Sequence, residues 1–135
     1  MPAELLIELT ERADRLMQDR QLREALPVYT ELRAIAPGDS YYPLQIASVF
    51  CQLGEITRAL PVLEEVLDAE PENGRALFVL AEMHIQLGNA AAAADCFRRL
   101  LVCPVTDVLR GVASKFVEWS DTQSGNLSTA PGELH

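Results

Sequence analysis

Basic side chains are scarce in this chain of 135 residues, which has 11 lysines and arginines against 20 aspartates and glutamates and a formal net charge of -9. A chain this acidic repels phosphate backbones and anionic lipid surfaces, so we expect no nucleic-acid partner and no membrane partner. Long hydrophobic runs are also missing. Apolar stretches such as 90–94 and 100–103 fall far short of the roughly 20 residues that a membrane-spanning helix requires.

Cysteine and histidine are few and scattered. Cys51, Cys96 and Cys103 match no metal-ligand spacing, so we expect reduced thiols that pack as small apolar side chains. His135 is the last residue, and His84 is expected to pack in the core. The sequence contains no phosphate-binding glycine loop, nucleophile elbow or zinc-ligand quartet. We therefore predict a protein that is not an enzyme and that has no catalytic residue, metal or cofactor.

The amino terminus, Met1–Leu6, has neither a basic region nor an uninterrupted apolar run. It therefore does not resemble a secretory signal, and we expect a cytoplasmic protein. A chain of this length can bury enough surface to fold as one domain without disulfide bonds.

The main positive feature of the sequence is an internal repeat with a period of 34 residues. The same offset relates prolines, glycines and bulky apolar residues as well as small ones. The recurring residues are the alanines Ala13, Ala47 and Ala81, the alanines Ala25, Ala59 and Ala93, the prolines Pro37 and Pro71, and the glycines Gly54 and Gly88. Pro104 falls one residue short of the next expected proline.

Apolar positions between these columns follow a helical period, and no segment alternates as a half-buried strand does. The chain therefore divides into three helix-turn-helix units at about 6–39, 40–73 and 74–107. Gly54 and Gly88 lie at the turn between the two helices, where a left-handed residue closes a helix without a Cβ penalty. Arg20 holds that place in the first unit, so its turn should be less favourable.

The segment after Pro104 predicts a capping helix at about 105–120. Its apolar side chains recur at spacings of three and four, which gives one apolar stripe. They are Val105, Val108, Leu109, Val112, Phe116 and Trp119. The stripe covers the third repeat or, as the alternative, joins two copies into a homo-oligomer. The composition beyond it favours a flexible tail at 122–135, so the folded domain is 1–121.

This 34-residue pattern resembles the tetratricopeptide repeat, with its alanine columns and terminal proline. The resemblance implies an all-α fold, a superhelix or α-α solenoid of three helix-turn-helix repeats closed by a capping helix. Leu9, Pro43 and Leu77 stand where the family usually has tryptophan, which implies weaker packing.

The resemblance also implies a concave groove lined by the first helix of each repeat. The partner-binding residues expected there are Tyr41, Leu44, Gln45, Ser48, Arg75, Phe78, Val79 and Glu82. Members of the family that grip acidic chaperone tails use lysine, asparagine and arginine at set positions. Of those positions only Arg75 matches here, since the others hold Thr10, Asp14, Gln45 and Val79. Apolar groups flanked by Glu11, Asp14 and Glu82 suit an apolar or mildly basic protein segment instead.

The leading functional hypothesis is therefore a protein-protein interaction module that binds a hydrophobic or amphipathic segment of a partner protein. Its size, acidity and architecture resemble the small bacterial cytoplasmic chaperones of type III secretion, which shelter an aggregation-prone segment of the partner. The alternative is a structural adaptor or assembly scaffold of a larger complex.

Overall fold

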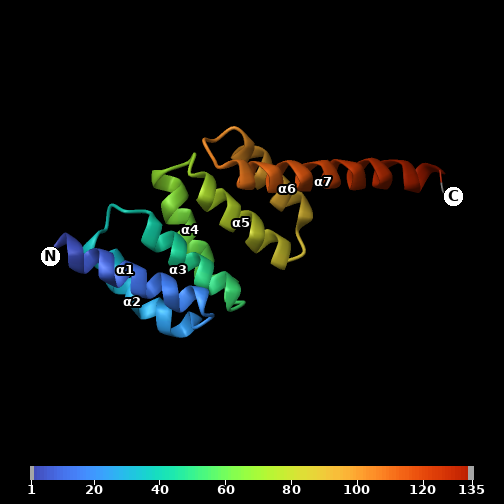
Figure 1. Cartoon of the computed structure of the whole chain (residues 1–135). Helices are drawn as coiled ribbons and strands as arrows, with labels where there is room; N and C mark the ends of the chain where they lie inside the picture. Colours follow the sequence, from blue (N-terminus) through green and yellow to red (C-terminus); the bar gives the residue numbers. More distant parts are fainter. Residues whose placement is uncertain (1, 134–135) are drawn as a thin grey trace. The chain divides into compact units, whose positions relative to one another are not determined.

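In the computed structural model, the backbone is described for residues 2–133 and the side chains for residues 2–123. Residues 2–133 form seven α-helices and no strand (Figure 1). The helices are α1 (Ala3–Gln18), α2 (Leu22–Ile35), α3 (Tyr41–Gln52), α4 (Ile56–Ala69), α5 (Gly74–Gln86), α6 (Ala90–Leu101) and α7 (Asp107–Glu133). The predicted all-α solenoid of helix-turn-helix repeats is confirmed.

The helix bounds reproduce the 34-residue period of the sequence. The first helices α1, α3 and α5 end at Gln18, Gln52 and Gln86, and the second helices begin at Leu22, Ile56 and Ala90. The starts of α1 and α5 keep this register less closely, and α6 ends two residues before the position equivalent to the ends of α2 and α4. Pro104 contributes to the early end of α6, because it comes one residue early and disfavours helical backbone in the residue before it.

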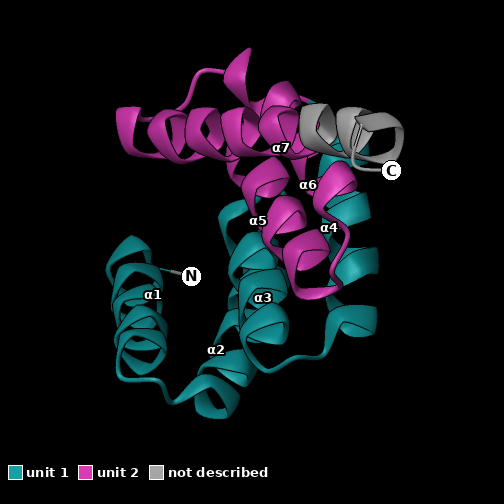
Figure 2. Ribbon diagram, turned by 90° about the vertical axis from the view of Figure 1, so that its right-hand side faces the viewer, with its two compact units in different colours: residues 1–71 teal, residues 72–135 magenta. Residues whose placement is uncertain are grey.

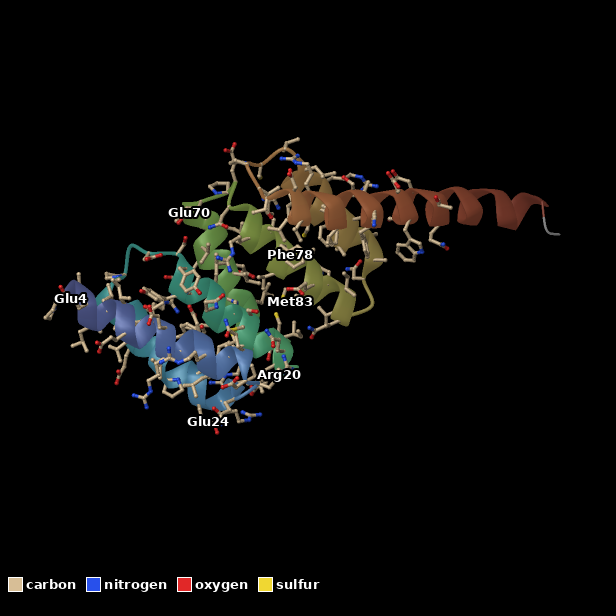
Figure 3. All side chains as sticks on the ribbon, in the orientation of Figure 1. Glu4, Arg20, Glu24, Glu70, Phe78 and Met83 are labelled. Carbon is tan, nitrogen blue, oxygen red and sulfur yellow. The ribbon has the colours of Figure 1, made fainter. Side chains whose placement is uncertain are left out.

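The turn between the two helices of each repeat has one residue with positive φ. These residues are Arg20 at 64°, Gly54 at 77° and Gly88 at 75°. In each turn the next amide donates to a carbonyl five residues back, at 2.8 Å from nitrogen to oxygen, which is the hydrogen bond of a Schellman cap. Arg20, which is labelled in Figure 3, thus takes the place of the glycine, as predicted.

Two columns of alanine allow the paired helices to approach closely. All six alanines are fully buried: Ala13, Ala25, Ala47, Ala59, Ala81 and Ala93. A longer side chain at any of these places would force the two backbones apart, since packed interiors leave no room for added methylene groups.

The chain forms two compact units, residues 1–71 and 72–135 (Figure 2). In the first unit α1 packs on α2, α2 on α3, and α3 on α4. In the second unit α5 packs on α6, and α6 on α7. The three cysteines are free and buried, as expected.

Aromatic rings connect the three helices of the second unit. Phe78 of α5 meets Phe97 of α6 edge-on with 5.9 Å between ring centroids. Phe97 lies 5.0 Å from Phe116 of α7, which lies 5.3 Å from Trp119. Such pairs add about 0.5–1.5 kcal/mol each beyond the area they bury, so they hold α7 against α6.

The last helix is longer than the expected capping helix at 105–120. It begins where Thr106 Oγ1 accepts a hydrogen bond from Leu109 N at 3.3 Å, and it continues to Glu133. The helix runs past residue 120, where Thr122 Oγ1 donates to the carbonyl of Glu118 one turn earlier at 2.9 Å. Arg98 also pairs with Asp121 at 2.5 Å. The tail expected at 122–135 thus overlaps α7. Its side chains from residue 124 onward lie outside the described residues, so the domain limit at 121 stays a prediction.

The positive φ of the turns predicts the effect of replacing one glycine. A Cβ at Gly54 would meet no atom within 4 Å, so Gly54→Ala imposes backbone strain alone. We expect the free energy of unfolding to fall by about 1 kcal/mol, measured by urea denaturation. Gly38 also has open space but no left-handed φ, so Gly38→Ala should leave stability unchanged or slightly higher. Equal losses for the two variants would contradict this account of the turns.

Candidate partner-binding surface

Helix α3 is buried on all but one narrow face. Its accessible side chains, at spacings of four, three and four, are Tyr41, Gln45, Ser48 and Gln52. The structure therefore places three of the four residues predicted on α3 at the surface. Leu44 is a correction, because it is only 3% exposed and belongs to the core. The more polar Gln45 takes the accessible place beside it.

Helix α5 is accessible over a wider face, since Ile85 and Gln86 in its last turn are exposed as well. Arg75 and Glu82 are exposed, and Phe78 is half-buried against Phe97. Val79 is the second correction, since it is 8% exposed and packs in the core. Of these two adjacent apolar residues, the smaller Val79 is enclosed and the larger Phe78 remains partly accessible. Desolvation raises the pKa of the Glu82 carboxyl.

A hydrogen-bond network joins α1, α2 and α3 beneath the accessible face of the first unit. The Tyr41 hydroxyl donates to Asp14, with its oxygen 2.9 Å from Oδ1 and 3.0 Å from Oδ2. The hydroxyl of Tyr29 on α2 also donates to Asp14 Oδ1. Gln45 Nε2 in turn donates to the Tyr29 oxygen at 3.2 Å. One turn earlier in α1, the hydroxyl groups of Thr10 and Tyr42 form a hydrogen bond with 2.9 Å between their oxygens.

The role of Tyr29 in this network was not predicted from the sequence. Its side chain is fully buried, and burial together with the hydrogen bond to Asp14 raises the pKa of its phenol well above the usual value. The hydroxyl therefore stays protonated and remains a donor. A signal was available, because Tyr29 shares its repeat column with Leu63 and Phe97. A lone hydroxyl in an apolar column requires a buried acceptor nearby.

The network opens into a small pocket of about 200 Å³ between α1 and α3. Its lining combines one carboxylate, three amides, a thioether and an aromatic ring. These belong to Asp14, Met17, Gln18, Tyr41, Gln45 and Gln52.

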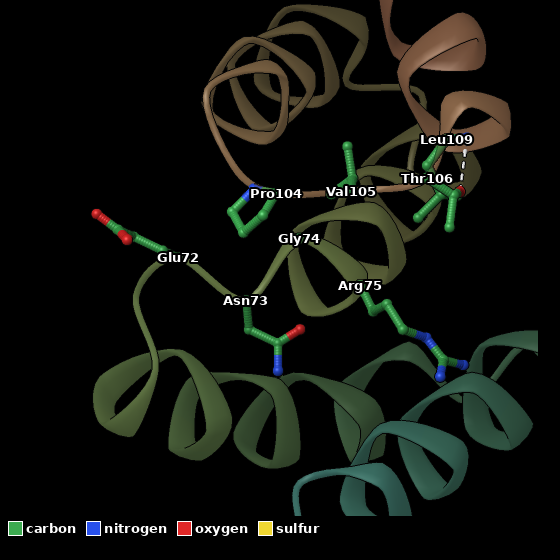
Figure 4. Close-up of a pocket in the computed structure, with 8 residues that line it drawn as sticks. All are labelled: Glu72, Asn73, Gly74, Arg75, Pro104, Val105, Thr106 and Leu109. Carbon is green, nitrogen blue, oxygen red and sulfur yellow. Dashed lines mark hydrogen bonds between the residues drawn. The ribbon is translucent and has the colours of Figure 1, made fainter.

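A larger depression of about 550 Å³ lies in the second unit, where the loop before α7 meets the start of α5 (Figure 4). The loop approaches so closely that a Cβ on Gly74 would lie 2.1 Å from Val105 Cγ1. Asn73 caps α5 by accepting from Ala76 N at 3.0 Å, and Thr106 caps α7. Each of these two polar side chains thus completes a helix.

Two kinds of feature are absent from the described part of the chain. Residues 2–133 contain no helix that is long and apolar enough to cross a membrane. Among residues 2–123, whose side chains are described, no group of histidine, cysteine, aspartate or glutamate side chains is placed to hold a metal ion.

The outer helix α7 departs from the single apolar stripe that its sequence predicts. Leu109, Ala113 and Phe116 lie on its inner side, with Ala113 fully buried. Val108, Val112 and Trp119 are 75%, 44% and 48% exposed, respectively. They form a second face, which we call the outer stripe of α7.

Comparison with known proteins agrees with this architecture. The family model of the tetratricopeptide repeat matches residues 44–104. The structure of PcrH from Pseudomonas aeruginosa has a TM-score of 0.78 at 21% identity, covering 87% of this chain and 92% of that chain. PcrH in complex with the chaperone binding region of PopD gives 0.79 at 20% identity, covering 92% and 96%.

A third similar structure is that of a T3SS complex from Aeromonas hydrophila, with a TM-score of 0.75 at 18% identity, covering 92% of this chain and 85% of that chain. At these identities the solved structures show the fold. The family model over residues 44–104, the 34-residue register and the three Schellman turns agree with these structures on the fold of the tetratricopeptide repeat.

Proposed function

We propose that the chain is a non-enzymatic protein-binding module that takes an apolar or amphipathic, mildly basic segment of a partner protein. The binding surfaces are the accessible faces of the first helices, α3 in the first unit and α5 in the second. One observation carries the proposal. On both helices the accessible side chains combine aromatic rings with polar groups, namely Tyr41 with Gln45 and Phe78 with Glu82.

The finer proposal is that the chain works as a small cytoplasmic chaperone of bacterial type III secretion. PcrH, which has the same fold over most of its length, is known in complex with the chaperone binding region of PopD. The acidity of this chain supports the same role, because a net charge of -9 keeps the chaperone soluble and favours basic or apolar segments over acidic ones.

The proposal predicts that bulky charges on these faces block the partner. Ser48→Arg with Glu82→Arg should weaken binding by about tenfold or more, because both residues lie outside the core and an arginine would occupy the contact surface. Binding is measured by isothermal titration with the partner purified from co-expression.

The matched control is Thr57→Arg with Glu64→Arg, which makes the same kinds of substitution on the exposed side of α4. We expect this variant to bind as the wild type does. A chaperone also keeps its partner soluble during co-expression, and the blocked variant should lose that effect. Normal binding by the blocked variant would refute the proposed surfaces.

The second candidate function is a structural adaptor, which the outer stripe of α7 favours. An exposed apolar face rimmed by charge is typical of an association surface. Under this hypothesis α7 joins the chain to a second copy or to a larger complex, and partner solubility does not depend on the chain.

A homo-oligomer formed through α7 has a direct test. Under this second hypothesis the wild-type chain sediments as a dimer, and Val108→Glu with Trp119→Glu sediments as a monomer of unchanged helix content, because each glutamate would bury a charge in the contact. Arg12→Glu with Arg15→Glu, on exposed positions of α1, supplies the control. A monomeric wild-type chain, or a dimer that survives the α7 substitutions, would rule out this interface.

A further inference from the structure

The carboxylate of Asp14 carries a negative charge that no basic side chain of the described residues neutralises. The ion pairs of the structure involve Glu55, Glu65, Asp95 and Asp121. Asp14 is instead held by two neutral donors, the hydroxyls of Tyr29 and Tyr41. A carboxylate offers about four acceptor positions, so these bonds orient it without saturating it.

The pocket around Asp14 has the chemistry of a site for an organic cation. Met17 contributes a polarisable sulfur, Gln18 contributes an amide, and Tyr41 contributes an aromatic ring. A ring face attracts an ammonium or guanidinium group, and an amide oxygen accepts from either.

One basic residue, Arg20, is hydrogen-bonded to a side chain that lines the pocket. The Arg20 guanidinium donates to Gln52 Oε1, and Gln52 Nε2 donates to Ser48 Oγ at 3.2 Å. Arg20 therefore holds the rim through Gln52 and leaves the Asp14 carboxylate available to a partner.

The size of the pocket indicates what it can hold. At about 200 Å³ it is smaller than the roughly 300–1,000 Å³ of typical small-molecule sites, so it suits one long side chain. An acidic side chain would be repelled by Asp14. An apolar side chain would desolvate the carboxylate without pairing it, which is unfavourable.

We propose that the pocket formed by Asp14, Met17, Tyr41 and Gln45 binds the lysine or arginine side chain of a partner segment. This inference rests on the proposed function and adds a specificity rule to it, namely one basic residue at a fixed position relative to the apolar ones. The hydrogen bond from Tyr29 holds the Asp14 carboxylate in place. A preorganised carboxylate binds a cation more tightly, because it needs no reorganisation when the cation arrives.

The test uses a phage-displayed library of random peptides as the probe, selected separately on the wild-type chain, Asp14→Asn and Asp68→Asn. Asp68 is an exposed aspartate of α4, so its variant makes the same change of charge away from the pocket. We expect the wild type and Asp68→Asn to enrich peptides with lysine or arginine at one position, and Asp14→Asn to lose that preference.

A second measurement uses the wild-type chain alone and so does not depend on the folding of any variant. Replacing the enriched lysine of the selected peptide by norleucine should weaken binding by about tenfold. An unchanged affinity, or the same basic preference with Asp14→Asn of native helix content, would overturn the inference. Apolar peptides enriched without any basic residue would overturn it and leave the proposed function standing. Enrichment of no peptide at all would overturn both this inference and the proposed function.

Discussion

The close approach of the two helices in each repeat is the constraint on which the rest of the structure depends. Six fully buried alanines make it possible, and the left-handed turns at Arg20, Gly54 and Gly88 return the chain so that the approach occurs. Helix α3, which packs on both α2 and α4, is covered on most of its sides. In α3 the enclosed residues include even Pro43 and Cys51, so only a narrow polar and aromatic face is left for recognition.

The fold follows from the sequence because its determinants are local and repeated. An alanine column, a turn residue and a terminal proline each act within one repeat, and the fixed offset of 34 residues reveals them without any knowledge of the packing. Even the early end of α6 can be explained by the displacement of Pro104. The continuation of α7 beyond residue 120 was less accessible, since it depends on contacts such as Arg98 with Asp121, which are 23 residues apart.

The surface was harder to predict, because position in a repeat does not determine which of two adjacent residues faces inward. Leu44 is enclosed and Gln45 is accessible, whereas at the equivalent positions Phe78 is accessible and Val79 is enclosed. In the first pair the more polar residue is the accessible one, and in the second pair the larger residue is the accessible one. Asp14 was expected at the groove as a flanking charge, but its support by Tyr29 requires the three-dimensional structure.

The central claim is that the first helices of the repeats, and not α7, receive the partner. Site-specific photo-crosslinking in the producing cell tests it most directly, with a photoreactive amino acid introduced at Gln45 or, in separate strains, at Lys115 on the exposed side of α7. The account predicts that position 45 crosslinks to one apolar or amphipathic segment that contains a lysine or arginine. Crosslinks to the partner from position 115 alone would contradict it.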